Sequence, residues 1–218
     1  MPLTPSPLSD DSVARCVAAI TAGSPVILPT DTVYGIAADA LNPVAVRAIY
    51  DAKGKEEAAP LQLLFSRDAP NLERFAALSV SAATLISPLG PGGWTVIVPA
   101  QPGWKSPALA GGGTVGIRIP DAPALWRVGD AFGGPLAASS ANRHGAPSPT
   151  TCAEAIMQVG ERCAVAIDTG PTAAALDSTV IDCSTAETRI LREGAIDRQT
   201  IARILGLSAI SVLRSVRP

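Results

Sequence analysis

The sequence has no excess of basic residues. Its 17 lysines and arginines are outnumbered by 19 aspartates and glutamates, which gives a formal net charge of −2. Proteins that bind nucleic acid over a large surface carry a strong positive field, because they must neutralise many phosphates. Wholesale nucleic-acid binding is therefore not indicated, whereas a local basic patch remains compatible with the sequence.

Residues that bind zinc are also scarce. The chain has one histidine, His144, and four cysteines, which are Cys16, Cys152, Cys163 and Cys183. None of the cysteines forms a Cys-x-x-Cys pair, and only Cys152 lies near His144 in the sequence, which argues against a zinc site. We interpret the cysteines as buried or idle thiols of a reducing cytosol.

Several common catalytic motifs are missing. No Walker loop precedes Lys53-Gly54-Lys55, and the chain contains no Gly-x-Ser-x-Gly. The string from Gly111 to Gly116 matches G-x-G-x-x-G, but it opens a strand instead of a helix, so dinucleotide binding is rejected. Ser140 and His144 lie four residues apart, but no acid is evident to orient the histidine, which we interpret as solvent-facing.

A membrane-spanning segment is not indicated either. The longest run without charged residues, 75–104, is interrupted by four prolines and four glycines, and these residues break a transmembrane helix. The N-terminus lacks the basic start and apolar core of a signal peptide. We therefore expect a soluble, cytoplasmic protein.

The chain does contain enough apolar residues for a globular domain. It has 218 residues, of which 47% are hydrophobic and 17% charged, and a chain of this length buries roughly 70% of its unfolded surface. Since only 4% of the residues are aromatic, the core must consist of Ala, Val, Leu and Ile. We expect a loose arm over 1–8, one domain over 9–207 and a C-terminal tail over 208–218.

Apolar runs and turn residues alternate along this domain in the manner of an α/β fold. Strands are predicted over 26–28, 34–38, 61–65, 94–98, 115–119, 136–139, 165–168, 178–182 and 189–192. Helices are predicted between Ser9 and Gly23 and over 43–54, 70–77, 80–87, 122–131, 151–159 and 197–205.

The stretch from Pro29 to Leu64 brings hydroxyls and cations to one end of the predicted sheet. The strand 26–28 leads into a polar elbow, and the helix that follows ends at Lys53-Gly54-Lys55. Cations at a helix C-terminus are explained by the helix dipole, and this interpretation is favoured for the lysine pair taken alone. An anion-binding site is the alternative.

Further hydroxyls and cations follow near predicted strand ends. Arg118 and Arg192 lie in aliphatic strands, Ser139 to Asn142 follows a strand of small residues, and Asp177-Ser178-Thr179 begins another. Each feature alone is equally compatible with an Asx-type turn or a solvent-facing arginine. Together they suit a substrate that carries phosphates and a carboxylate.

In their order along the chain, these motifs resemble those of the YrdC/Sua5 family, the threonylcarbamoyl-AMP synthases. The matching strings are Pro-Thr-Asp-Thr-Val-Tyr-Gly (29–35), Lys-Gly-Lys (53–55), Ala-Pro-Leu (59–61), Thr-Val-Gly-Ile-Arg-Ile-Pro (114–120), Ser-Ser-Ala-Asn (139–142) with Gly145 and Pro-Ser-Pro-Thr (147–150), Ser-Thr-Val (178–180) and Ile-Leu-Arg-Glu-Gly (190–194). The resemblance covers roughly 12–206. Some family members have a second C-terminal domain, which we do not expect here.

The resemblance implies an α/β fold in which a twisted mixed sheet with flanking helices surrounds a deep basic cavity. It also implies an enzyme, a nucleotidyltransferase that makes L-threonylcarbamoyl-adenylate and pyrophosphate from L-threonine, bicarbonate or CO2, and ATP. A downstream threonylcarbamoyl transferase complex would then form N6-threonylcarbamoyladenosine (t6A) at position 37 of tRNA. Direct contact with tRNA is left open.

The family's site residues transfer to this sequence by motif. The resemblance implies threonine binding by Thr32, Arg118, Ala138 and Ser178 and catalytic cations at Lys53 and Lys55. It implies ATP binding by Lys55, Thr114, Ser140, Asn142, Ser148 and Arg192, with Mg²⁺ on the ATP phosphates and no metal held by the protein alone. The family's usual Lys-x-Arg is Lys-x-Lys here, which keeps the charge but loses the forked grip of arginine on phosphate. Ala59 and Leu64 also differ from the asparagine and histidine that are common at these positions.

Two alternatives remain open on the sequence. One is a non-catalytic RNA- or nucleotide-binding module of the same fold, with its chemistry weakened by Lys-x-Lys; Arg214 and Arg217 in the tail mildly favour it. The other is carbamoyl-adenylate chemistry, as in the related domain of hydrogenase-maturation carbamoyltransferases. The absence of acylphosphatase and zinc-finger segments argues against this second alternative.

Overall fold

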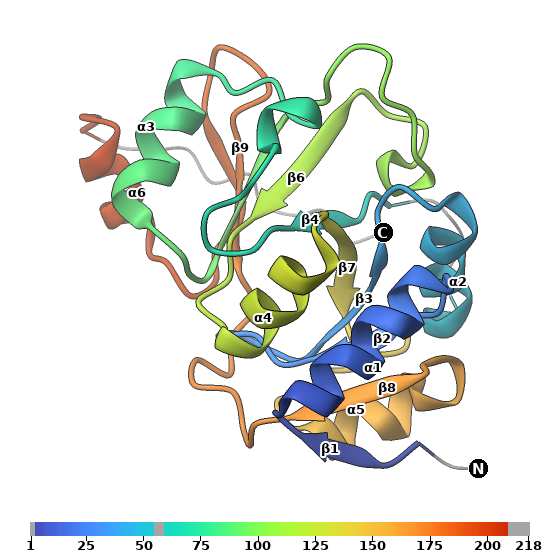
Figure 1. The fold of residues 1–218 in the computed structure, drawn as a ribbon. Helices are drawn as coiled ribbons and strands as arrows, with labels where there is room; N and C mark the ends of the chain where they lie inside the picture. Colours follow the sequence, from blue (N-terminus) through green and yellow to red (C-terminus); the bar gives the residue numbers. More distant parts are fainter. Residues whose placement is uncertain (1–2, 55–58, 209–218) are drawn as a thin grey trace.

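The described part of the chain is built around one twisted mixed sheet of ten strands (Figure 1). A computed structural model describes residues 3–54 and 59–208. The strand order is β1-β8-β2-β3-β7-β4-β6-β5-β9-β10. The strands are β1 (Pro5–Pro7), β2 (Val26–Leu28), β3 (Gly35–Asp39), β4 (Gln62–Leu64), β5 (Trp94–Pro99), β6 (Thr114–Arg118), β7 (Leu136–Ser140), β8 (Val165–Asp168), β9 (Thr179–Asp182) and β10 (Arg189–Arg192).

Six α-helices flank this sheet, and local capping explains where several of them begin and end. They are α1 (Asp10–Thr21), α2 (Pro43–Lys53), α3 (Val80–Leu89), α4 (Pro123–Phe132), α5 (Cys152–Val159) and α6 (Arg198–Ile204). Ser9 forms a capping box with Ser12 at the start of α1. Asn42 caps α2, which ends where Gly54 adopts the left-handed conformation with φ of 61°.

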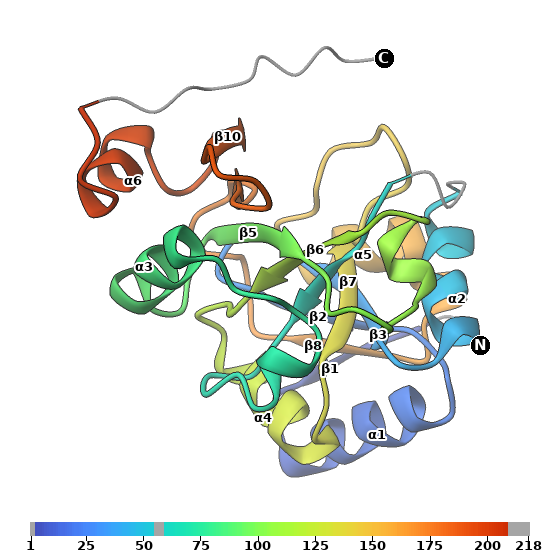
Figure 2. The ribbon, with the colours of Figure 1, turned by 90° about the horizontal axis from the view of Figure 1, so that it is seen from above.

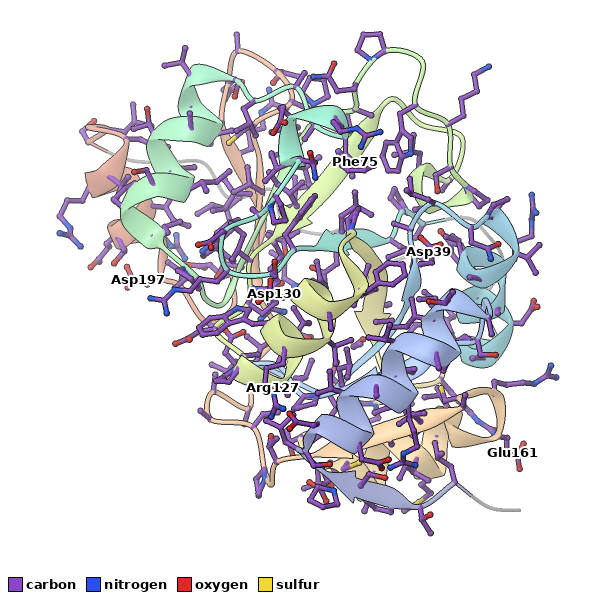
Figure 3. The ribbon with its side chains drawn as sticks, in the orientation of Figure 1. Asp39, Phe75, Arg127, Asp130, Glu161 and Asp197 are labelled. Atoms are coloured by element: carbon purple, nitrogen blue, oxygen red, sulfur yellow. The ribbon has the colours of Figure 1, made fainter. Side chains whose placement is uncertain are left out.

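The helices cover the two faces of the sheet and bury two hydrophobic clusters. One cluster contains side chains of α1 and α4, and the other contains side chains of α2, α3, α5 and α6. Figures 1 and 2 show α1 and α4 next to each other on one side of the sheet. In Figure 2 they lie at the bottom of the view, whereas α2 and α5 lie apart from them towards the right. At the surface, Arg127 of α4 forms an ion pair with Asp10 at the start of α1, and Figure 3 shows Arg127 beside α1.

Most predicted strands and helices agree with the structure to within one or two residues, but two predictions are wrong. Residues 5–7 do not belong to a loose arm, because they form β1, which pairs in parallel with β8. The predicted helix over 70–77 is only the short 3-10 turn Leu72–Arg74. Ala69 and Asn71 have positive φ values of 43° and 60°, and a continuous α-helix cannot pass through that conformation.

No helix within 3–54 and 59–208 is both long and apolar enough to cross a membrane.

Candidate active site

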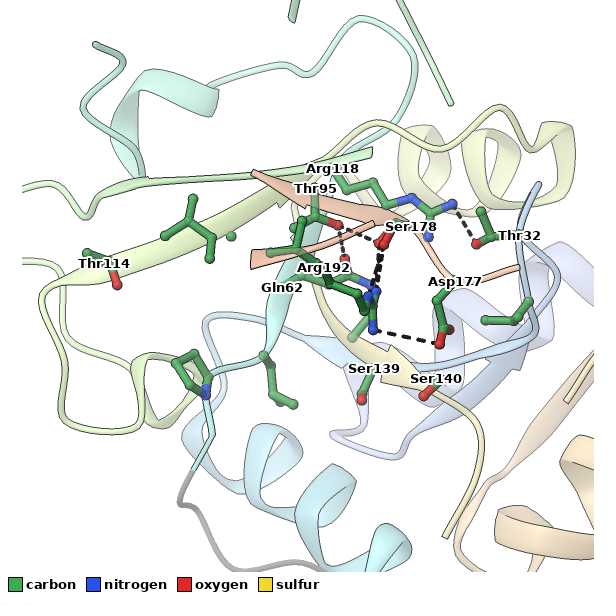
Figure 4. Close-up of a pocket in the computed structure, with 17 residues that line it drawn as sticks. Thr32, Gln62, Thr95, Thr114, Arg118, Ser139, Ser140, Asp177, Ser178 and Arg192 are labelled. Carbon is green, nitrogen blue, oxygen red and sulfur yellow. Dashed lines mark hydrogen bonds and ion pairs between the residues drawn. The ribbon is translucent and has the colours of Figure 1, made fainter. Parts of the chain in front are cut away.

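A cavity of about 250 Å³ opens over the strands in the middle of the sheet (Figure 4). Its volume is just below the range of roughly 300–1,000 Å³ that small-molecule sites commonly have. It is lined by Thr32, Val33, Pro60, Leu61, Gln62, Thr95, Ile97, Thr114, Gly116, Arg118, Ala138, Ser139, Ser140, Asp177, Ser178, Val180 and Arg192. Seven of the predicted site residues are therefore together in one cavity: Thr32, Thr114, Arg118, Ala138, Ser140, Ser178 and Arg192.

The cavity continues the sheet face that α1 and α4 cover. Leu64 of β4 and Leu136 of β7 pack in the cluster beneath these helices. Two residues along the same strands, Gln62 and Ala138 line the cavity, and residues two apart in a strand share a face. The sheet therefore supplies the hydrophobic core at one end of these strands and the cavity floor at the other.

Arg118 is the most deeply buried charged residue of the cavity. It ends β6 with only 2% of its surface exposed, and its Nη2 donates hydrogen bonds to Asp31 Oδ1 at 2.6 Å and Thr32 Oγ1 at 2.8 Å. Burial lowers the pKa of Arg118, and the Asp31 carboxylate opposes that shift. The guanidinium remains charged at neutral pH, so it can bind a carboxylate at this end of the cavity.

The elbow between β2 and β3 is fixed by its own hydroxyls. Thr30 Oγ1 lies 3.0 Å from Thr32 Oγ1 and donates to the carbonyl of Val33 at 2.7 Å. Thr30 and Thr32 are both buried. The Thr32 hydroxyl is therefore held against Arg118 by local turn structure, which explains why a short sequence motif can specify its place.

Arg192 marks the other charged position of the cavity. Its Nη2 donates to the backbone carbonyl of Ser178 at 2.9 Å and to Ser178 Oγ at 3.2 Å. Its Nη1 lies 3.7 Å from Asp177 Oδ2, and Asp177 also accepts a hydrogen bond from Ser148 Oγ at 3.1 Å. Arg192 is half-exposed, so a phosphate can reach it from solvent.

The predicted ATP residues Asn142 and Ser148 and the predicted catalytic Lys53 do not line the cavity. Lys53 is 5% exposed, and its Nζ donates to the carbonyl oxygens of Ser140 at 2.5 Å and Asn142 at 2.7 Å. The Asn142 side chain accepts a hydrogen bond from Ser140 Oγ at 2.5 Å. Lys53 and Asn142 therefore hold the loop that presents Ser140 to the cavity.

Lys55, predicted as both catalytic and ATP-binding, lies outside the described residues. His144 is exposed, and its backbone N–H donates to the carbonyl of Lys53 at 2.8 Å. This agrees with the prediction of a solvent-facing loop histidine.

The charges of the described cavity are partly balanced. Its charged lining residues among those described are two arginines, Arg118 and Arg192, and one aspartate, Asp177. Each arginine has a carboxylate neighbour, since Asp31 lies against Arg118 and Asp177 lies beside Arg192. The described lining therefore carries a net charge of +1, less than a strongly basic cavity would have.

Several polar residues of the site have no role assigned from the sequence, and three of them make contacts that shape it. They are Asp31, which pairs with Arg118, and Gln62 and Thr95, which meet on the cavity floor with Thr95 Oγ1 donating to Gln62 Oε1 at 2.8 Å. Asp31 was within a recognised motif. Thr95 could have been found from strand alternation, because its neighbours Trp94 and Val96 are buried apolar residues and Thr95 points to the opposite face.

This arrangement can bind a small molecule with two anionic ends. Guanidinium groups prefer carboxylates and phosphates, and the hydroxyl-bearing residues Thr32, Thr114 and Ser140 line the same cavity. The fold and site thus define an α/β protein with a polar cavity for an anionic small molecule.

Comparison with known proteins gives the family. A family model named Sua5_yciO_yrdC, with the description "Telomere recombination", matches residues 18–194. Threonylcarbamoyl-AMP synthase of Bacillus subtilis is 36% identical over 91% of this chain and 58% of its own length. A putative threonylcarbamoyl-AMP synthase of Mycobacterium tuberculosis H37Rv is 35% identical over 92% of both chains. The chain belongs to the Sua5/YciO/YrdC family.

Solved structures agree with this assignment. Pyrococcus abyssi Sua5 in complex with L-threonine matches with a TM-score of 0.88 and 27% identity, covering 96% of this chain and 61% of that one. Escherichia coli YciO matches in fold, with a TM-score of 0.79 and 20% identity over 91% of this chain and 97% of that one. The chain therefore spans about three-fifths of the Bacillus and Pyrococcus relatives and nearly all of the mycobacterial one and of YciO.

Proposed function

We propose that this chain is an enzyme, a nucleotidyltransferase that makes L-threonylcarbamoyl-adenylate from L-threonine, bicarbonate or CO2, and ATP, with release of pyrophosphate. Relatives at 35–36% identity are named threonylcarbamoyl-AMP synthases, and a similar structure contains L-threonine. In the proposal, threonine occupies the end of the cavity at Thr32 and Arg118, and ATP occupies the end at Thr114 with its phosphates towards Arg192.

The observation that carries the proposal is the arrangement around Arg118. Only one of its terminal nitrogens, Nη2, bonds to Asp31 and Thr32, and the side chain lies at the wall of the cavity. A guanidinium held along one edge can still offer its other nitrogen to a carboxylate. Ala138 and Ser178 then bound a small space, which suits the short side chain of threonine.

The proposed reaction joins three substrates in two steps. The threonine amine attacks CO2, a C–N bond forms, and a proton leaves to give an N-carboxylate. An oxygen of this carboxylate then attacks the α-phosphorus of ATP, the bond to the β-phosphate oxygen breaks, and pyrophosphate leaves. The protein supplies positioning and charge stabilisation, which together account for most of the effect in phosphoryl-type transfers.

The cations at the phosphate end would offset repulsion between the attacking carboxylate and ATP. Arg192 lies at the cavity, and Lys55, outside the described residues, is proposed to join it. Mg²⁺ is proposed to arrive on the ATP phosphates and to neutralise their charge. Within 3–54 and 59–208, no group of three or more His, Cys, Asp and Glu side chains lies close enough to hold a metal.

The product is a reactive mixed anhydride, so a second protein must consume it promptly. We propose that a threonylcarbamoyl transferase complex passes the group to adenosine 37 of tRNA, which would make this reaction the first step of t6A formation. Direct contact of this chain with tRNA is not required by the proposal.

The test is pyrophosphate release by purified protein with MgATP, bicarbonate and threonine, and with each of them omitted in turn. We expect release to require all three. Arg118→Gln should lower the rate by at least about 10²-fold, whereas the surface variant Arg15→Gln should not change it. Absence of threonine-dependent pyrophosphate would contradict the proposal, and salt-dependent tRNA binding without synthesis would favour a non-catalytic module instead.

A further inference from the structure

The cavity floor carries a polar pair that the proposed function leaves without a role, Gln62 and Thr95. Gln62 on β4 pairs with Gly116 of β6 on one side and Ala138 of β7 on the other. Neither neighbour has a side chain larger than a methyl group, so the Gln62 side chain is uncovered towards the cavity (Figure 4). A Cβ at Gly116 would lie 3.1 Å from Thr95 Cγ2 and 3.6 Å from Gln62 Cβ.

The orientation of the Gln62 amide sets the direction of a series of hydrogen bonds. Thr95 Oγ1 is 2.8 Å from Gln62 Oε1, which can only accept, so the Thr95 hydroxyl donates to it. Thr95 Oγ1 is also 2.9 Å from Ser178 Oγ. Because the single proton of Thr95 is already used, Ser178 donates to Thr95. Ser178 Oγ in turn accepts from Arg192, which can only donate.

These hydrogen bonds engage the oxygen of the Gln62 amide and leave its nitrogen for a ligand. Thr95 is 5% exposed, so its hydroxyl is held in the floor. Within the described residues, no group accepts a hydrogen bond from Gln62 Nε2, and the side chain lines the cavity. The floor therefore presents two N–H donors that carry no formal charge.

The register of the strands places these donors midway between the two ends of the site. Thr114, Gly116 and Arg118 follow one another on the same face of β6, and Gly116 is the residue that pairs with Gln62. Thr114 is proposed to bind the nucleotide and Arg118 the amino-acid carboxylate. The part of the bound substrates that lies over Gln62 would therefore be the part that links the amino acid to the nucleotide.

We propose that Gln62 is a substrate-binding residue whose Nε2 donates to an oxygen of the carboxylate formed on the threonine amine, and that Thr95 is the residue that positions it. The inference rests on the proposed function, since that carboxylate exists only if threonine reacts with CO2. Two N–H groups orient its oxygens for attack on the α-phosphorus without adding a charge that would hold the nucleophile too tightly.

The test compares Gln62→Glu with wild type in the pyrophosphate assay. Glutamate has the same shape and keeps the acceptor for Thr95, but it replaces the donating nitrogen with a charged oxygen. We expect the rate to fall by about 10²-fold and the apparent KM for bicarbonate to rise. Binding of threonine alone, measured by calorimetry without ATP or bicarbonate, should stay within about twofold, because Arg118 and Thr32 are unchanged.

Thr95 is tested by a pair of variants. Thr95→Val removes the hydroxyl at nearly constant volume and should lower the rate by roughly tenfold through misplacement of Gln62. Thr95→Ser keeps the hydroxyl and should recover at least half of the wild-type rate. Gln199→Glu on the exposed side of α6 introduces the same charge far from the cavity and should leave the rate at the wild-type value.

Each outcome decides between the inference and its alternatives. A wild-type rate for Gln62→Glu overturns the inference. A loss of threonine affinity as large as the loss of rate also overturns it, because Gln62 would then bind the amino acid itself. If Gln62→Glu does not fold, judged from its thermal unfolding, Gln62→Met tests the same donor without the charge. A wild-type protein that releases no pyrophosphate refutes the proposed function first and this inference with it.

Discussion

Asp31 shows how a buried arginine is kept available for a substrate. The Arg118–Asp31 pair has side chains that are 3% and 17% exposed, and removing one partner of a buried pair leaves the other charge uncompensated. Asp31→Asn should therefore lower the free energy of unfolding by about 3–5 kcal/mol. Urea denaturation measures this change.

A matched surface pair provides the control for that prediction. Asp11 and Arg15 form an ion pair at 3.0 Å with side chains 80% and 50% exposed, so Asp11→Asn should change stability by less than about 1 kcal/mol. Threonine should also stabilise Asp31→Asn more than wild type, because its carboxylate supplies the missing counter-charge. Equal effects of the two substitutions would show that Asp31 is not needed to compensate Arg118.

Lys53 gives a second prediction at the scale of one residue. Its ammonium group donates to two backbone carbonyls and to Asn142 Oδ1, so Lys53→Met leaves buried acceptors without their donor. We expect a loss of about 3 kcal/mol in the free energy of unfolding, whereas Lys105→Met at the surface should have almost no effect. If Lys53 instead acts only as a phosphate cation, Lys53→Met will unfold with the same free energy as wild type, and only its affinity for ATP will fall.

At the scale of elements, β6 sets the distance between the two ends of the site. Gly116 lies between Thr114 and Arg118, and any Cβ there would lie 3.1 Å from Thr95 Cγ2. Gly116→Val should fill the middle of the cavity and abolish pyrophosphate release, while threonine still binds near Arg118 within about threefold. Calorimetry with threonine and the pyrophosphate assay check the two halves of the prediction, and an active valine variant would contradict it.

The same elements explain what could be predicted from the sequence. β2 and α2 were predictable because their signals are local: an apolar run for β2, and the Asn42-Pro43 start and the Gly54 end for α2. The Thr32 elbow was predictable for the same reason. Seven of the predicted site residues line one cavity, and each belongs to a short motif in or beside a strand.

The features that the sequence did not predict depend on partners far along the chain. β1 is a three-residue strand with two prolines, and only its pairing with β8, about 160 residues later, makes it a strand. Gln62 of β4 meets Thr95 of β5, and Thr95 meets Ser178, the residue before β9. The phosphate role of Lys53 is implied by the family resemblance, and the sequence shows only that Lys53 lies at a helix end. The carbonyl groups of Ser140 and Asn142 that its ammonium group contacts lie 87 and 89 residues away and are not visible as its partners in the sequence.

At the scale of the whole molecule, Tyr34 joins the beginning of β3 to the loop after β8. Its hydroxyl lies 2.7 Å from the carbonyl of Gly170 and 3.1 Å from Asp168 Oδ1, and it accepts a hydrogen bond from the Thr169 N–H. The backbone of Tyr34 also bonds to Pro149 and Ala141. One buried residue therefore connects three segments, the loop after β8 through its side chain and residues 141 and 149 through its backbone.

This connection predicts a loss of stability at alkaline pH. Burial raises the pKa of Tyr34 from 10.0 to about 12; Asp168 adds to the shift, and the Thr169 N–H opposes it. Between these values the unfolded chain loses the phenol proton while the folded protein keeps it, so stability is complete below pH 10 and falls as pH rises towards 12.

Between pH 9 and pH 11, wild type should lose about 1 kcal/mol more unfolding free energy than Tyr34→Phe. The thiols of Cys16, Cys152 and Cys163, whose pKa values are also raised to about 12 by burial, contribute the same loss to both proteins. Urea denaturation at a series of pH values therefore isolates Tyr34, and parallel curves for the two proteins would mean that its hydroxyl is not buried in the folded state.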